Sequence, residues 1–421
     1  IHLIKLFIAM LYLLTMAYKK VKVYPITIQN YWRYSLSSVI LFFGTIALFV
    51  LGARGGDFKK STRPITLIDA MDHVKTPKQA DVVLSSTFTF LKTLGKNGYK
   101  KPKNNFTDQQ IQQELKTIKQ YHPSGRFEKK PNVFIFILES MGREYWGALN
   151  EKYNIPNYEG YTPFLDSLAQ HSLIFPNGFA TSRKSIHGMP SILAGIPSFE
   201  TSYASSLYSR QEVASVVSIA KELGYHTSFF HGAANGSMGF LGFANTLGFD
   251  RYYGRTEFNY DEEFDGSWGI WDEPFLQYTK SVLDKQNTPF LSSVFTITSH
   301  EPYVIPRAYE GKFDTGHIPM HQCVGYTDNA LRQFFKESKS ATWFEDTIFI
   351  FTADHGNQTH FPFYEQTVNR FANPLMIFKP NSTLNGVDMR LASHMDIFPT
   401  CLLYTSPSPR DQRGSRMPSS A

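Results

Sequence analysis

Acidic and imidazole side chains follow four of the five strands that the sequence predicts. Glu139 follows NVFIFIL, His231 closes TSFFH, His300 follows FLSSVFTITS, and Asp354 with His355 follows TIFIFTA. Because ligands of open α/β sheets bind beyond the carboxyl ends of the strands, these side chains should converge from distant positions. Carboxylates and imidazoles bind divalent metals and transfer protons. The pattern therefore predicts a metal or acid/base site at one edge of a sheet.

The adjacent pair Asp354 and His355 is the most specific of these signals. Two metal-capable side chains at one strand end, followed by Gly356, which permits a turn, are typical of a divalent metal site. Each of the other three residues, taken alone, is equally typical of a solvated strand end or an ordinary loop histidine. The full set makes a metal-free structural or binding protein the least favoured hypothesis.

The segment FATSRKSIHGMPSILAGIP supplies hydroxyl groups beside an expected helix start. It contains Thr181, Ser182 and Ser185, the cations Arg183 and Lys184, and then an apolar helical run. A hydroxyl at a helix start suits ester chemistry because backbone N–H groups and the helix dipole stabilise an anion, while a metal lowers the pKa of the hydroxyl. The alternative is an N-cap serine that has no catalytic role.

Short β-branched and aromatic runs alternate with helical segments and predict an α/β domain over residues 131–403, with a mainly parallel sheet flanked by helices. The predicted strands are Asn132–Leu138, Thr227–His231, Pro289–Thr296, Thr347–Thr352 and Leu375–Phe378. Residues 55–130 are polar and rich in Lys and Gln, and we expect a juxtamembrane connector with a helix over Asp108–Tyr121. Residues 404–421 are rich in Ser, Pro and Arg, which predicts a disordered, non-native tail.

Residues 1–54 are predicted to form a transmembrane region with two helices. The segments Ile1–Tyr18 and Tyr34–Ala53 are apolar, and each approaches the roughly 20 residues that a helix needs to cross a bilayer. A buried core helix is the alternative. The loop between them carries four Lys or Arg residues, which places it in the cytoplasm and the rest of the chain outside. The chain opens on Ile1 inside an apolar run, which is typical of a fragment.

The composition is that of a globular protein. Hydrophobic residues make up 42% and charged residues 19% of the 421 residues, which excludes disorder as a general description. The net charge is +6, but Lys and Arg are scattered, so we expect attraction to anionic headgroups and no nucleic-acid binding. Cys323 and Cys401 are the only cysteines, so neither a disulfide framework nor a cysteine-based zinc site is indicated.

Nine sequence blocks, in order along residues 131–403, carry a resemblance to a known family. They are NVFIFILES, TPFLDSLAQHS, KSIHGMPSILAGIP, LGYHTSFFHG, FDGSWGIWDE, PFLSSVFTITSHEPY, FTADHG, NPLMIFKP and SHMDIFPT. This region resembles the sulfatase-like branch of the alkaline phosphatase superfamily, and in particular the lipoteichoic acid synthase family. The resemblance implies an alkaline-phosphatase-like α/β catalytic domain preceded by transmembrane helices.

The resemblance also implies one divalent metal ion, which we expect to be Mn, with Mg or Zn as alternatives. Its implied ligands are Glu139, Ser185, Asp354 and His355. Ser185 stands where relatives have a nucleophilic Thr in a basic-Thr-x-x-Gly context, and Thr181 is the second candidate.

His231 and His300 match histidines that line the family's substrate site, where they bind phosphate oxygens or pass a proton to the leaving group. Lys184, beside the expected nucleophile, is also predicted to bind substrate. The implied enzyme is a bacterial, multi-pass membrane phosphotransferase with an extracytoplasmic catalytic domain. It would transfer a phospho-group from a phospholipid donor to an envelope glycan or lipid acceptor through a Ser-linked intermediate. The alternative is an extracytoplasmic sulfatase or phosphodiesterase.

The sequence departs from the family's pattern at two places. Met238 and Phe240 stand where lipoteichoic acid synthases have a Trp and an Arg that hold glycerophosphate, which puts that transferred group in doubt. The Cys/Ser-x-Pro-x-Arg signature of true sulfatases is absent, which argues against ordinary sulfate-ester hydrolysis. The remaining candidates are His360, which could reach the metal or substrate, the structural pair His394 and Asp396, and the unassigned Trp268, Trp271 and Asp272.

Overall fold

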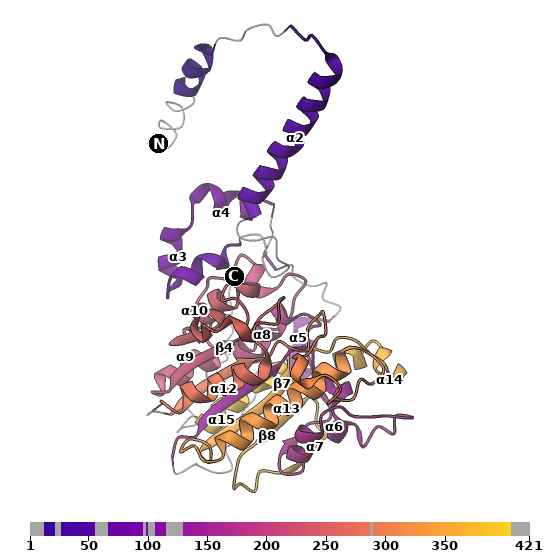
Figure 1. Ribbon diagram of the computed structural model, residues 1–421. Coiled ribbons are helices and arrows are strands. Elements are labelled where there is room, and N and C mark those ends of the chain that lie inside the picture. The colour runs from indigo at the N-terminus through magenta and orange to yellow at the C-terminus, as the bar shows by residue number, and fades with distance from the viewer. Residues whose placement is uncertain are drawn as a thin grey trace. The chain divides into compact units, whose positions relative to one another are not determined.

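The computed structural model describes residues 12–21, 27–54, 66–95, 98–99, 106–114, 129–286 and 289–405 (Figure 1). The chain divides into two compact units, Ile1–Gly56 and Asp57–Ala421. Each unit is described by itself below.

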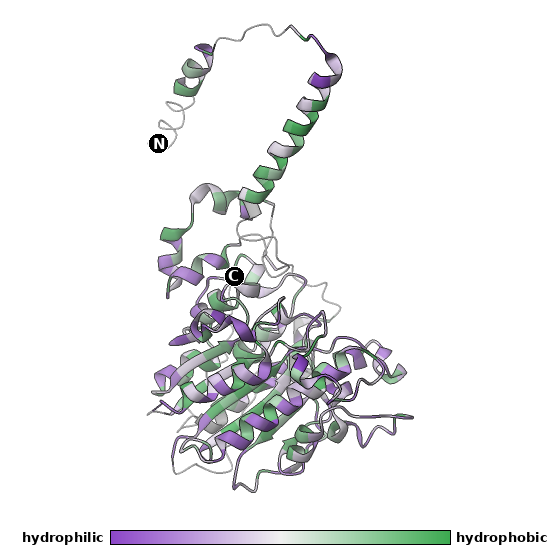
Figure 2. Cartoon of the chain, viewed as in Figure 1, coloured by the Kyte–Doolittle hydropathy of each residue, from purple (hydrophilic) through white to green (hydrophobic). Residues whose placement is uncertain are grey.

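The first unit contains the helix α2, Tyr31–Arg54. Its segment Tyr31–Gly52 is, among the described residues, the one stretch of helix long and apolar enough to cross a membrane. Figure 2 shows α2 as mostly hydrophobic along its length. The predicted helix Ile1–Tyr18 lies largely outside the described residues, although residues 12–19 are helical. The described chain therefore supports one membrane helix and does not support the predicted multi-pass arrangement.

The second unit is built on an eight-stranded sheet with the order β5-β4-β6-β1-β7-β8-β2-β9. The five strands β5, β4, β6, β1 and β7 run parallel to one another, whereas β8 is antiparallel to its neighbours β7 and β2. The strand bounds are β1 Asn132–Leu138, β2 Leu173–Ile174, β4 His226–His231, β5 Arg251–Tyr253, β6 Phe290–Phe295, β7 Thr347–Ala353, β8 Leu375–Phe378 and β9 Gly386–Val387. The predicted α/β class with a mainly parallel sheet is confirmed.

Helices cover both faces of the sheet, so its central strands are apolar on both sides. Every residue of β1 is buried, and its side chains alternate between two cores. Phe134 and Phe136 pack in the core under α12 and α13, whereas Val133 and Ile135 pack in the core under the other helices. Figure 1 shows α12 and α13 lying along one face of the sheet. The bounds are α12 Asp272–Leu283 and α13 Met320–Ser338 on the first face, and α8 Ser185–Ala194, α9 Val216–Glu222, α10 Phe240–Leu247 and α15 His394–Thr405 on the second.

The predicted connector forms short helices in the part that the structure describes. Their bounds are η1 Ile68–His73, α3 Pro77–Val83, α4 Ser86–Thr93 and α5 Asp108–Glu114. Ile68 is buried and joins the core beneath α10. The predicted helix Asp108–Tyr121 is present as α5, and its remaining residues, like the tail residues 406–421, lie outside the described chain.

Candidate metal centre

Glu139, Asp354 and His355 form one cluster, in which one ligand atom from each residue lies within 4.8 Å of the others. All three are buried. The sheet explains the meeting, because β1 and β7 are parallel neighbours with Leu138 paired to Ala353. Glu139 and Asp354, the residues that directly follow β1 and β7, therefore place their carboxylates at the same edge of the sheet.

Ser185 joins this cluster as the first residue of α8. Its Oγ lies 3.4 Å from Glu139 Oε2 and 3.3 Å from His355 Nε2. The helix start comes this close because a Cβ on Gly188 would lie 2.8 Å from the carbonyl oxygen of Asp354. Only glycine permits that approach in the first turn of α8.

The polar atoms of the cluster fit a divalent cation. Asp354 Oδ1 accepts hydrogen bonds from two backbone N–H groups, whereas Asp354 Oδ2 is buried without a hydrogen-bond partner. His355 Nδ1 must carry the proton, because it donates to the carbonyl of Gly356 at 2.8 Å. In a neutral imidazole, His355 Nε2 would therefore present a lone pair 3.2 Å from Asp354 Oδ2. Two facing lone pairs in a buried site are the arrangement that a bound cation stabilises.

The pKa of Glu139 in the metal-free site supports the same conclusion. Burial and the charge of Asp354 raise the pKa of Glu139 well above its ordinary value. A bound divalent cation reverses this effect, because it favours the charged carboxylates. Carboxylate and imidazole ligands together suit Mn²⁺, Mg²⁺ or Zn²⁺.

Ser140 connects the two acidic ligands, a role that the sequence analysis missed. Its backbone N–H donates to Asp354 Oδ1 at 2.7 Å, and its hydroxyl donates to Glu139 Oε1 at 2.7 Å. Its φ of 58° is in the left-handed region, which costs free energy for a non-glycine residue. Asn357 Nδ2 lies 3.5 Å from the Ser140 hydroxyl and donates to Tyr303 Oη at 3.0 Å. The available signal was the Ser that directly follows Glu139 in the block NVFIFILES.

His394 contacts the backbone of Ala353, the residue before Asp354. This contact fits the structural role that the sequence predicts for His394. Its Nε2 lies 2.8 Å from the carbonyl oxygen of Ala353, to which it donates, and burial lowers its pKa to about 4. Thr181 lies beside His394, and its hydroxyl donates to Ser191 at 2.7 Å. The Thr181 hydroxyl thus contacts Ser191, whereas the Ser185 hydroxyl contacts Glu139 and His355 of the cluster.

His231 lies at the end of β4 in an apolar environment. Its ring packs against Phe240 and Phe295 at centroid distances of 5.0 and 5.4 Å, and Nδ1 lies 3.4 Å from Tyr252 Oη. Burial lowers the pKa of His231 to about 3. The imidazole is therefore neutral at physiological pH.

His300 lies in the loop after β6, where other residues hold it in place. Its Nδ1 donates to the carbonyl of Glu301 at 3.1 Å, and its ring lies 4.1 Å from that of Trp268. Asp272 accepts hydrogen bonds from the backbone N–H of Ile297, at 2.8 Å, in the same loop. Trp268 and Asp272, which the sequence left unassigned, thus position the loop that carries His300.

The ring of His360 stacks on His317 with centroids 4.0 Å apart. Its backbone N–H donates to Glu144 at 2.7 Å. Lys184 is exposed and precedes Ser185 in an extended conformation. Its side chain is therefore accessible to a substrate beside the start of α8.

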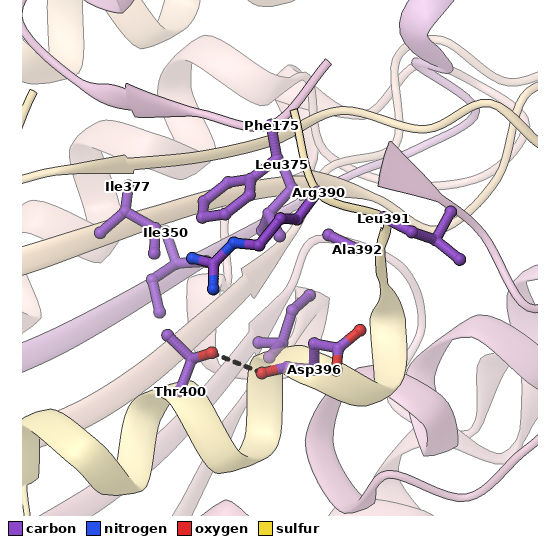
Figure 3. A pocket seen from close by; sticks show the side chains of 10 residues that line it. Phe175, Ile350, Leu375, Ile377, Arg390, Leu391, Ala392, Asp396 and Thr400 are labelled. Atoms are coloured by element: carbon purple, nitrogen blue, oxygen red, sulfur yellow. Dashed lines mark hydrogen bonds between the residues drawn. The ribbon is translucent and has the colours of Figure 1, made fainter. Parts of the chain in front are cut away.

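A cavity of about 330 Å³ lies between β7, β8 and α15 (Figure 3). Most of its lining is apolar, as at Phe175 and Ile350, with Arg390, Asp396 and Thr400 as polar exceptions. None of the cluster residues lines this cavity. The strand-end cluster therefore remains the candidate site for chemistry.

A mostly parallel sheet with two carboxylates, a histidine and a hydroxyl at its strand ends defines an α/β protein of the alkaline phosphatase type. The sequence profile described as Sulfatase matches residues 131–406. The chain belongs to the sulfatase family, within which it is a sulfatase-like relative of the lipoteichoic acid synthases.

Individual relatives agree with this placement. The chain is 24% identical to lipoteichoic acid synthase of Staphylococcus saprophyticus over 394 residues, which cover 85% of this chain and 58% of that protein. It is 25% identical to lipoteichoic acid synthase 1 of Bacillus subtilis over 58% of this chain and 42% of that protein. The chain thus spans about half the length of these relatives.

Two solved structures share the fold. One is an alkaline phosphatase superfamily protein from Vibrio parahaemolyticus, with a TM-score of 0.59 and 29% identity, covering 69% of this chain and 71% of that one. The other is the lipoteichoic acid synthase LtaP from Listeria monocytogenes, with a TM-score of 0.60 and 21% identity, covering 68% of this chain and 74% of that one.

Proposed function

We propose that this chain is a membrane-anchored, metal-dependent phosphotransferase. It moves a phospho-group from a phospholipid donor to an envelope glycan or lipid through an intermediate on Ser185. The observation that carries the proposal is the place of the Ser185 hydroxyl, within 3.4 Å of both Glu139 Oε2 and His355 Nε2. The similarity to lipoteichoic acid synthases supports a transfer reaction over simple hydrolysis.

The residues Glu139, Ser185, Asp354 and His355 would hold one divalent metal, for which Mn²⁺ is our first choice. When bound, the metal would polarise the ester oxygens of the substrate and lower the pKa of the Ser185 hydroxyl. In the first step, Ser185 Oγ would form a bond to phosphorus while the bond between phosphorus and the donor's leaving oxygen breaks. In the second step, a hydroxyl oxygen of the acceptor would form a bond to phosphorus while the bond between phosphorus and Ser185 Oγ breaks. The Ser185 proton has Glu139 Oε2 as an acceptor at 3.4 Å.

Three side chains, His231, His300 and Lys184, would bind the phospho-group of the substrate. His231 is neutral because burial lowers its pKa to about 3, so its N–H would donate a hydrogen bond to a phosphate oxygen and it would not act as a proton shuttle. His300 has its Nδ1 proton committed to Glu301, which leaves Nε2 to receive or deliver a proton at the leaving oxygen. The exposed Lys184 adds a positive charge next to Ser185.

We assign residues 131–403 to the catalytic domain and residues 55–130 to a connector. The helix α2 would anchor the chain in the cell membrane of a bacterium, with the catalytic domain outside the cytoplasm. The phospholipid donor of the enzyme would then come from the membrane in which α2 is anchored. The matching Sulfatase profile favours a second candidate, an extracytoplasmic phosphodiesterase or sulfatase.

The two candidates differ in their need for an acceptor. We would incubate the detergent-solubilised full chain and Mn²⁺ with labelled phospholipids, with and without envelope glycan, and with soluble phosphate and sulfate esters. A transferase forms labelled glycan and turns over little in water alone. Acceptor-independent release of phosphate or sulfate would instead establish the hydrolase.

A further inference from the structure

The helices that follow α2 in the sequence carry apolar side chains that no other part of the described chain covers. No residue of α4 is buried, and Phe90 and Leu91 are 62% and 63% exposed. Leu94, directly after α4, is 65% exposed, and Val82 in α3 is 88% exposed. These four residues are called the α4 face. Large exposed apolar side chains on ordered helices indicate a contact surface.

Contacts on both sides of the α4 face hold this segment on the catalytic domain. Before it, Ile68 is buried in the core beneath α10, and Asp81 of α3 forms an ion pair with Arg210. After it, the ring of Tyr99 stacks on Tyr208 with centroids 5.1 Å apart. These contacts tie the chain on both sides of α4 to the catalytic domain.

Positive charges accompany the α4 face. Lys75 and Lys78 are exposed, and Lys92 lies over the ring of Phe88. The nearby acid Asp81 already has Arg210 as its ion-pair partner. Apolar side chains flanked by lysines complement a surface with an apolar interior and anionic headgroups.

We propose that the α4 face docks on the surface of a bilayer that contains anionic phospholipid. Phe90, Leu91 and Leu94 enter the interface between headgroups and acyl chains, while Lys75 and Lys78 contact the phosphates. The proposal rests on the proposed membrane anchoring. It assigns α3 and α4 the role of holding the catalytic domain against the membrane that supplies the donor lipid.

Environment-sensitive thiol probes test the docking in the full chain, reconstituted in nanodiscs of phosphatidylglycerol and phosphatidylcholine with spin-labelled lipid. The native Cys323 and Cys401 are buried, so an engineered exposed cysteine is labelled selectively. Three variants are compared: Leu91→Cys in the α4 face, Leu48→Cys in α2, and Val368→Cys as a control with 66% exposure, close to that of Leu91.

At position 91 we expect the probe's fluorescence emission to shift to the blue and to be quenched by spin labels at shallow depth in the bilayer. At position 48 we expect quenching by spin labels at deep positions. At position 368 we expect neither a shift nor quenching. Quenching at 48 with a signal at 91 equal to that at 368 would overturn the docking and leave the anchoring intact. Quenching at neither 48 nor 91 would overturn both. Quenching at 91 alone would support the docking and count against α2 as a spanning helix.

Lipid charge tests the role of the lysines. Pure phosphatidylcholine nanodiscs should weaken quenching at position 91, and Lys75→Gln with Lys78→Gln should weaken it equally in the anionic nanodiscs. If quenching at position 91 changes neither in the neutral nanodiscs nor in the lysine variant, the two lysines do not contact the headgroups.

Discussion

The metal side and the histidine side of the candidate site are built differently. Glu139, Asp354 and Ser185 lie at strand ends and a helix start, and contacts of 3.4 Å or less join each of them to another member of the cluster. The contacts of His231 and His300 instead go to aromatic rings and to their own loops. The parallel register sets the positions of Glu139 and Asp354, whereas aromatic and loop contacts set those of His231 and His300. Changes on the two sides should therefore have different signatures.

Ser185→Ala should have the largest effect. It removes the nucleophile, so transfer should fall at least about 10³-fold, in the range seen when other enzymes lose a nucleophile. Mn²⁺ binding, measured by calorimetry, should persist because Glu139, Asp354 and His355 remain. Thr181→Ala is the matched control and should keep most of the activity. Equal losses in both variants would remove the distinction between the two hydroxyls.

Asp354→Asn should weaken Mn²⁺ binding by at least about 100-fold, because it replaces the unpaired, charged Oδ2 with an amide. The Oδ1 atom can still accept the backbone N–H groups of Ser140 and His355. In the presence of EDTA the variant should therefore melt no lower than the wild type, since the repulsion from Glu139 is also removed. Unchanged metal content by elemental analysis would overturn the ligand assignment.

Removing the Ser140 hydroxyl should weaken Mn²⁺ binding by about 10- to 100-fold, the usual effect of losing a group that orients a metal ligand. Both Ser140→Ala and Ser140→Gly lose the hydrogen bond to Glu139. Because the φ of 58° suits glycine, Ser140→Gly should have the higher melting temperature of the two. Wild-type metal affinity in both variants would show that Glu139 needs no such support.

His231→Asn should lower kcat/KM by about 10-fold, the cost of one lost hydrogen bond, and leave Mn²⁺ affinity unchanged. The pH profile of kcat between pH 5 and 9 should keep its shape, because a pKa near 3 keeps His231 neutral throughout. A displaced profile would show that His231 transfers a proton.

The same variant has a stability signature with a defined sign. Since the folded pKa lies below the unfolded value of about 6.5, the unfolded chain binds the proton first as pH falls. As the pH falls from 7 to 5, His231 should therefore lower the free energy of unfolding of the wild type by about 2 kcal/mol. The variant lacks the imidazole and should not show this loss of stability. Denaturant midpoints at the two pH values give the comparison.

The five predicted strands were recognisable from the sequence because they are mostly buried runs rich in β-branched and aromatic residues, whereas the short strands β2, β5 and β9, which are partly or fully exposed, were not predicted. The predicted bounds of β1 and β8 match the structure, whereas β6 is one residue shorter at each end than Pro289–Thr296. The meeting of Glu139 with Asp354 and His355 followed from the rule that parallel strand ends share an edge. Sequence pattern and sheet geometry therefore sufficed to predict that these three side chains meet.

The supporting residues were not predictable, because their roles depend on tertiary contacts between loops. The positive φ of Ser140 and the packing of Trp268 on His300 leave no periodic signal in the sequence. The burial of His231 depends on where α10 places Phe240. His360 follows the metal-ligand motif closely, yet its ring stacks on His317.

A trapped intermediate tests the central claim most directly. The full chain with Mn²⁺ would be incubated with a panel of headgroup-labelled phospholipids without acceptor, quenched with acid, digested and sequenced by mass spectrometry. We expect a labelled phospho-group on Ser185, present in Thr181→Ala and absent in Ser185→Ala. A label on Thr181, or turnover of the lipid with no label on any hydroxyl of the segment from Thr181 to Ser185, would contradict it.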